Sequence, residues 1–163
     1  MSIAGIIASL DQLAQLHQSL LQLSLSKTEV LKKGDTEELQ KLLKKEQKHI
    51  QAVNQVEAQR LSKIRQWATD HNFDPEATTV TFLLEHLPNE QENLALEEVT
   101  TSLAETLVQL KQQEALNQQL TEQSLQFVKM NIEMLAPSIQ NINYGNKQKQ
   151  TSENKRSVFD SKA

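Results

Sequence analysis

Cysteine is absent from this 163-residue sequence, and glycine, proline and aromatic residues are scarce. Without cysteine the chain has no disulfides, no thiolate metal ligands and no thiol nucleophile. Three glycines and three prolines leave few turns, whereas an all-β sandwich or barrel needs a turn signal about every 8–12 residues. The elements must therefore be few and long. Hydrophobic residues make up 37% of the chain, a supply that suits long helices joined along a narrow apolar contact.

Long apolar runs and a basic composition are missing as well. No run approaches the ~20 residues of a membrane-spanning helix. The apolar start, MSIAGIIASLDQ, follows no basic region and is interrupted by Asp11, so we expect neither a signal peptide nor stable membrane insertion. A net charge of -4 argues against a dedicated nucleic-acid-binding protein. We therefore expect a cytoplasmic protein with no nucleic-acid partner.

Apolar periodicity predicts an all-α fold with helices over about residues 2–33, 36–70, 79–87 and 90–136. The first helix has two adjacent apolar stripes, which suits a helix that touches two neighbours. We expect it to be the central helix of an elongated antiparallel three-helix bundle or coiled coil. The alternative is a structural coiled-coil protein that self-associates, as a weak homo-oligomer, through the second stripe. The first stripe is Ile3, Ile7, Leu10, Ala14, Leu21 and Leu25, and the second is Ile6, Leu13, Leu16, Leu20, Leu23 and Val30.

The junctions between these helices carry capping signals. Gly34 tolerates the left-handed conformation that ends a helix, and Asp35 can cap the next helix, with Glu38 three residues later. The short helix over 79–87 is expected to be capped by Thr78 or Thr79 and to close one end of the bundle.

The second helix has an apolar seam that includes three ionisable residues, Glu46, His49 and Arg60. One interpretation places them at the edge of the seam, with buried stems and charged ends in water. The other makes them a polar break that fixes the register of the helices. The first interpretation is favoured, because buried polar groups are costly unless they are paired.

The composition changes after Pro137, which is expected to end the longest helix at Ala136. Residues 137–163 are rich in Asn, Gln, Ser and Lys and cannot build a core. We predict a basic tail that is disordered when free. Its scattered apolar residues are typical of a segment that orders on a partner, although an idle terminus is an equal alternative. These residues are Ile139, Ile142, Tyr144, Val158 and Phe159.

Signatures of catalysis are missing from the chain. There is no HExxH zinc motif, no glycine-rich phosphate loop and no GxSxG elbow. None of the four histidines has another histidine three or four residues away, and the adjacent glutamate pairs point to different helix faces. We therefore expect a protein that is not an enzyme, with no catalytic residues, no metal and no cofactor.

An apolar series lies at the end of the longest helix, at Leu120, Phe127, Met130 and Met134. Such a stripe packs in a core in most proteins. Methionine is also frequent where a surface accepts helical partners, and the spacing provides the anchors that helix-in-groove recognition needs. Both interpretations remain open from the residues alone.

This arrangement resembles the FlgN family of flagellar type III export chaperones, in a Gram-positive form. The resemblance covers most of the chain as a pattern of helices. It includes the turn LKKGDTEELQKLLKKE at residues 31–46, VEAQR at 56–60 and the short capped helix at 79–87. It continues with the long helix, NYG at 143–145 and a closing SVFD at 157–160. The polar stretch after Tyr144 is longer than the family pattern.

The resemblance implies a cytosolic chaperone, without ATP hydrolysis, for the hook-associated proteins that join hook and filament. Such a chaperone binds their helical terminal segments, prevents premature assembly and delivers them to the flagellar export gate. The resemblance implies that Tyr144 docks on the cytosolic domain of the gate. It places binding of the junction proteins in the C-terminal part, at Phe127, Met130, Met134, Ile139, Ile142, Val158 and Phe159, with Leu120 upstream.

Overall fold

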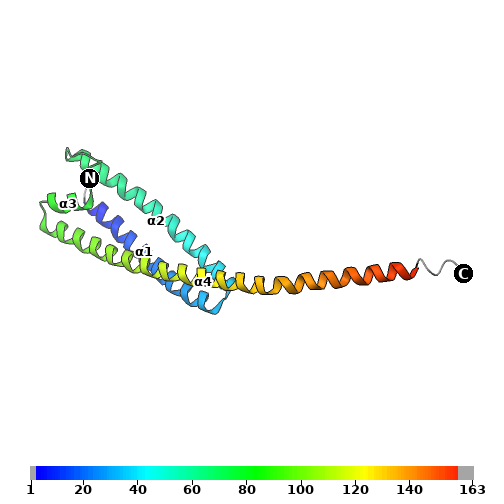
Figure 1. The fold of residues 1–163 in the computed structure, drawn as a ribbon. Coiled ribbons are helices and arrows are strands. Elements are labelled where there is room, and N and C mark those ends of the chain that lie inside the picture. The colour runs from blue at the N-terminus through cyan, green and yellow to red at the C-terminus, as the bar shows by residue number, and fades with distance from the viewer. Residues whose placement is uncertain (1–2, 158–163) are drawn as a thin grey trace. The chain divides into compact units, whose positions relative to one another are not determined.

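The computed structural model of the chain describes the backbone of residues 3–157 and the side chains of residues 3–136. Four helices follow one another, α1 (Ala4–Lys33), α2 (Thr36–Asp70), α3 (Val80–His86) and α4 (Glu90–Ser157) (Figure 1). No strand occurs within the described backbone, so the predicted all-α fold is confirmed. The chain divides into two compact units, Met1–Leu120 and Thr121–Ala163. None of the described helices is long and apolar enough to span a membrane.

The first unit is a bundle of α1, α2 and the first part of α4 (Figure 1). Lys63 near the end of α2 contacts Ser9 near the start of α1, whereas Glu46 near the start of α2 contacts Lys27 near the end of α1. The two helices are therefore antiparallel. Contacts between α1 and α4 advance together along both helices, from Gln18–Thr106 to Ser24–Glu114 and Thr28–Asn117. The helices α1 and α4 are therefore parallel.

The apolar core lies at the end of the bundle where α1 begins. Ile6, Leu83 and Leu96 are fully buried there, and Trp67 is 4% exposed. Leu83 belongs to α3, so the short helix closes this end, as the sequence predicted. The core includes members of both stripes of α1, Ile3 and Leu10 from the first and Ile6 and Leu13 from the second. This burial is consistent with α1 as the central helix, and it occupies part of the stripe that the self-association alternative needed.

Local capping explains where α1 ends and where α2 and α3 begin. Gly34 has a φ of 69°, and its N–H donates to Leu31 O, which ends α1. The Asp35 carboxylate accepts the N–H of Glu38 at 3.0 Å and caps α2. The Thr79 hydroxyl accepts the N–H of Phe82 at 3.1 Å and caps α3.

The expected end of the last helix at Ala136 is corrected by the structure, because α4 continues through Pro137 to Ser157. Proline lacks an N–H and crowds the carbonyl four residues earlier, at a cost of about 3 kcal/mol. This cost disfavours a helix without forbidding one, and the residues on both sides of Pro137 remain helical. That residues 137–163 act as a separate tail, disordered when free, stays a prediction. Their side chains, and the whole of residues 158–163, lie outside the described part of the chain.

Candidate partner-binding site

Exposed apolar side chains are concentrated in residues 121–136 of α4, which we call the apolar segment. All of its residues are exposed. The predicted site residues Phe127, Met130 and Met134 are 66%, 54% and 68% exposed. Soluble proteins rarely leave such a contiguous apolar patch without a function. Of the two interpretations of this stripe, exposure therefore supports a binding surface over a core.

The apolar segment has two apolar stripes, of which the sequence reasoning used only one. Phe127, Met130 and Met134 share one side of the helix, because residues three and four apart are neighbours. A second set, spaced by three, four and three residues, occupies the far side of the helix and was missed, although the spacing alone could have revealed it. A partner can therefore contact this helix on two sides. The second stripe consists of Leu125, Val128, Ile132 and Leu135, all more than half exposed.

The other predicted site residues are not brought into this surface by the described structure. Leu120 is half-buried in the first unit. Ile139, Ile142 and Tyr144 belong to the helical backbone of α4, but their side chains lie outside the described residues. Val158 and Phe159 lie outside them entirely. The roles of these residues stay predictions.

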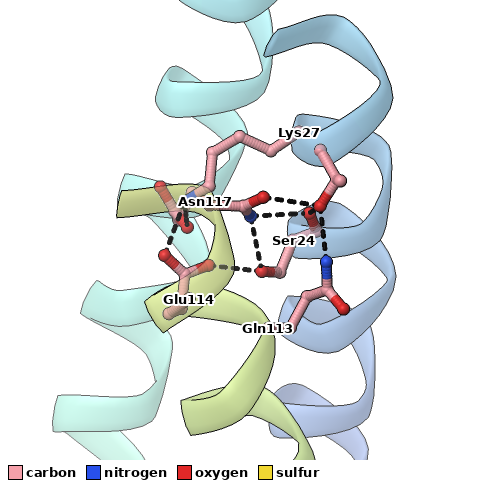
Figure 2. A network of polar contacts seen from close by, with 7 residues as sticks. Ser24, Lys27, Gln113, Glu114 and Asn117 are labelled. Carbon is pink, nitrogen blue, oxygen red and sulfur yellow. Dashed lines mark hydrogen bonds and ion pairs between the residues drawn. The ribbon is translucent and has the colours of Figure 1, made fainter. Parts of the chain in front are cut away.

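A network of polar side chains crosses the first unit just before the apolar segment begins (Figure 2). The Lys27 ammonium donates to Glu46 Oε1 at 2.7 Å and to Glu114 Oε2 at 2.9 Å. It thereby joins α1 to both α2 and α4. The other oxygen of Glu114 accepts the hydroxyl proton of Ser24 on α1. We call this network the polar layer, and it consists of Ser24, Lys27, Thr28, Glu46, Gln113, Glu114 and Asn117.

Asn117 completes the polar layer between α1 and α4. Its side-chain amide donates to Ser24 O at 2.9 Å and to Ser24 Oγ at 3.1 Å, while its oxygen accepts the Thr28 hydroxyl proton. Gln113 donates its side-chain amide to the same Thr28 hydroxyl. Asn117 is 3% exposed, yet no buried side-chain N or O among the described residues lacks a hydrogen-bond partner. The layer is therefore fully satisfied, the condition under which a buried polar network specifies one arrangement.

The two carboxylate partners of Lys27 stabilise its charged form. Burial by itself lowers the pKa of Lys27, but the hydrogen bonds and charges of Glu114 and Glu46 outweigh it and raise the pKa above 10.5. Lys27 is therefore a charged ammonium at neutral pH. Its side chain is only 11% exposed, and that of Glu46 is 18% exposed. A change that removes either partner leaves a poorly hydrated charge in the bundle.

The ionisable seam residues Glu46 and Arg60 of α2 are both paired, but only Glu46 is paired with another helix. Glu46 binds Lys27 in the polar layer. The Arg60 guanidinium, whose side chain is 15% exposed, donates to Glu57 through Nε and Nη2. This hydrogen bonding lowers the pKa of Glu57. The favoured interpretation, charged ends in water, was therefore wrong for Glu46, which the polar break describes better. Arg60 pairs with a residue of its own helix that is 40% exposed, which fits the edge of the seam.

The histidines occupy structural positions on their own helices. Each ring contacts the carbonyl oxygen four residues earlier, at 2.7–2.9 Å, so Nδ1 must be the protonated nitrogen that donates. Within residues 3–136 no group of three or more His, Asp or Glu side chains could hold a metal ion. The four pairs are His17–Leu13, His49–Lys45, His71–Trp67 and His86–Phe82.

A helical bundle that leaves two apolar stripes of its last helix exposed is typical of a protein-binding module. The model of the family described as FlgN protein matches residues 1–152 of the chain. The uncharacterized protein YvyG of Bacillus subtilis (strain 168) is 38% identical over 165 residues, which cover 100% of both chains. No solved structure matches. The chain belongs to the FlgN family of flagellar export chaperones, and the resemblance noted in the sequence is confirmed.

Proposed function

We propose that this protein is a cytoplasmic chaperone that binds the helical terminal segments of hook-associated proteins through the apolar segment. In this proposal it prevents their premature assembly and delivers them to the flagellar export gate. The observation that supports it is the exposure of Phe127, Met130 and Met134 together with that of the second stripe. Membership of the FlgN family supports the class of partner.

The chemistry of the apolar segment suits an amphipathic helical partner. Anchors spaced by three and four residues fit a helix that lays its own apolar face along them. Burying one large apolar side chain stabilises a complex by about 1.5–3 kcal/mol. Methionine and phenylalanine provide much contact area, and the flexible methionine side chain adapts to more than one sequence. A chaperone for two junction proteins would use that adaptability.

The test is the affinity of the full-length chain for peptides that correspond to the terminal helices of the hook-associated proteins, measured by calorimetry. The triple variant Phe127→Ala, Met130→Ala and Met134→Ala should raise the Kd at least about 100-fold, because these side chains are the central anchors. The variant Leu125→Ala, Val128→Ala and Ile132→Ala should also weaken binding if the partner contacts both stripes.

The matched control replaces three exposed apolar residues of α4 that lie outside the apolar segment, Leu94→Ala, Val108→Ala and Leu116→Ala. This control should bind with the affinity of the unchanged chain. Equal affinity of the Phe127 triple variant would overturn the proposed site. If the unchanged chain bound none of the peptides and instead dimerised in sedimentation experiments, the structural coiled-coil alternative would replace the chaperone proposal.

Docking on the export gate forms a separate part of the proposal. The only tyrosine, Tyr144, is the residue that the family resemblance assigns to this contact. Tyr144→Ala should abolish capture of the chain by the cytosolic domain of the gate while leaving the Kd for the terminal-helix peptides unchanged. Loss of both activities would instead indicate that Tyr144 supports the fold or the peptide site.

A further inference from the structure

The polar layer interrupts a regular seam of α4 that continues into the apolar segment. In the first unit this seam occupies positions spaced alternately by three and four residues, and every one is buried or half-buried. The same spacing continues without a break in residues 121–136. The seam reads Leu96, Val99, Leu103, Thr106, Leu110, Gln113, Asn117 and Leu120, and then Ser124, Phe127, Asn131 and Met134.

A repeating seam permits alternative registers. If α4 slid along α1 and α2 by one heptad, about 10 Å, residues seven positions later would occupy each site in the bundle. Phe127 would then take the place of Leu120. A slide of two heptads would also draw Met134 into the bundle. Each slide would cover part of the apolar segment and remove it from the surface that a partner needs.

The polar layer is satisfied in the observed register alone. Lys27 meets Glu114, and Ser24 and Thr28 meet Asn117. After a slide of one heptad, Thr121 and Ser124 would occupy the places of Glu114 and Asn117.

After a slide of two heptads, Val128 and Asn131 would occupy those places. Asn131 could replace the amide of Asn117, but no carboxylate would replace Glu114. In both slid registers the buried Lys27 would lose one of its two anionic partners, which is strongly unfavourable.

We propose that the polar layer is a register lock: it fixes which residues of α4 are covered by α1 and α2 and so keeps the apolar segment exposed for the partner. That a partner needs the exposed apolar segment rests on the proposed function, whereas the register lock itself is a property of the free chain. A buried asparagine that sets helix register in coiled coils works by the same physics.

The decisive variant replaces the layer with apolar residues, by Lys27→Met, Glu46→Leu, Glu114→Leu and Asn117→Leu. Because a well-packed apolar replacement of a buried ionic group is often neutral or stabilising, this chain should fold with a cooperative transition. Its α4, however, should populate slid registers that the unchanged chain excludes.

The register of α4 against α1 is measured by cross-linking pairs of introduced cysteines. The chain has no native cysteine, so only the introduced pair can react. Gln18 Oε1 lies 3.5 Å from Thr106 Oγ1, so Gln18→Cys with Thr106→Cys reports the observed register to a short bismaleimide. Gln18→Cys with Gln113→Cys reports a slide of one heptad, and Gln18→Cys with Leu120→Cys a slide of two. Because Gln113 belongs to the polar layer, each cysteine pair is introduced in both the layer variant and its matched control, and only the two are compared. We expect the slid cross-links to rise about tenfold or more in the layer variant.

A matched control makes the same types of change at exposed positions, by Lys33→Met, Glu37→Leu, Glu98→Leu and Gln109→Leu. It should cross-link only in the observed register. If the layer variant lost its cooperative transition, Asn117→Leu alone would serve, with a smaller rise in the same slid cross-links. Slid cross-links no more frequent than in the control would overturn the register lock.

Affinity for the terminal-helix peptides then separates the two proposals. The fraction of the layer variant that cross-links in a slid register should equal the fraction that fails to bind. Slid cross-links without any loss of binding would refute the link between register and exposure. Failure of the unchanged chain to bind peptides would refute the proposed function and leave the cross-linking result standing.

Discussion

The most direct test of the energetics is the substitution Lys27→Met, which keeps the length of the side chain and removes its charge. Glu46, whose side chain is 18% exposed, then loses its ammonium partner. Glu114 loses the same partner but is 40% exposed and retains its contact with Ser24. Removing one member of a buried ion pair costs about 3–5 kcal/mol, and water at Glu114 offsets part of this. We expect a loss of about 2–4 kcal/mol in the free energy of unfolding.

For a chain of this size about 3 °C of Tm corresponds to 1 kcal/mol, so the Tm should fall by about 6–12 °C. Urea unfolding followed by far-ultraviolet circular dichroism measures the helices. Fluorescence of the single tryptophan, Trp67, reports the core independently because it is 4% exposed. Coincident transitions by the two probes would justify a two-state free energy.

Two further variants identify the cause of the expected loss. Lys41→Met removes a lysine that pairs with Glu37 and Glu38 on the surface, at 3.5 Å and 3.4 Å, and should cost less than about 1 kcal/mol. Adding Glu46→Leu and Glu114→Leu to Lys27→Met should restore most of the lost stability. A Lys27→Met chain as stable as the unchanged chain would refute the account of a buried, charge-balanced layer.

Three other predictions concern the pH dependence of stability and the turn at Gly34 between α1 and α2. Because the pKa of Lys27 is raised in the folded chain, its contribution is complete below pH 10.5 and is lost as the pH rises through the raised value. Urea unfolding at increasing alkaline pH should show this loss in the unchanged chain and not in Lys27→Met. The pKa of Glu57 is lowered, so its contribution is present above pH 4.5 and is lost as the pH falls through the lowered value; Glu57→Gln should flatten that part of the acid profile. Gly34→Ala should cost about 1 kcal/mol in urea unfolding, because φ is 69° and the added methyl group meets nothing within 4 Å, while Gly34→Asn should cost less.

The sequence predicts the helices well because their signals are local and agree with one another. Apolar spacing, a left-handed glycine at Gly34 and a capping carboxylate at Asp35 all indicate the same junction, and the structure shows each of them. The predicted end of α4 at Ala136 was wrong, and the reason is also physical. The rule applied at Pro137 is a local preference worth a few kcal/mol, and a local preference predicts where a helix is weakened without determining where it ends.

The candidate binding surface was only half visible in the sequence. Spacing located Phe127, Met130 and Met134, but it could not distinguish an exposed stripe from a buried one, because both have the same periodicity. The second stripe, which begins at Leu125, has that periodicity too and was overlooked. Exposure depends on which helices cover α4, and that is a property of the assembled bundle.

The polar layer was missed because its residues are of types that are normally exposed, although their positions continue the buried spacing of their helices. On α1 the spacing that runs through Leu13 and Leu20 continues to Ser24 and Lys27, both buried, although serine and lysine on a helix normally suggest a surface. On α4 the same continuation reaches Asn117, which is buried too.

The turn at Gly34 makes part of the layer predictable in principle. In an antiparallel hairpin, residues at similar distances from the turn lie side by side. Lys27 of α1 therefore falls within about two helical turns of Glu46, which interrupts the apolar seam of α2. The level of α4 is different, because no local sequence signal in the connection between α2 and α4 sets its register. In the register lock proposed above, Glu114 and Asn117 select one through their contacts with Lys27, Ser24 and Thr28. The register lock would thus assign to the polar layer the part of the fold that sequence patterns leave undetermined.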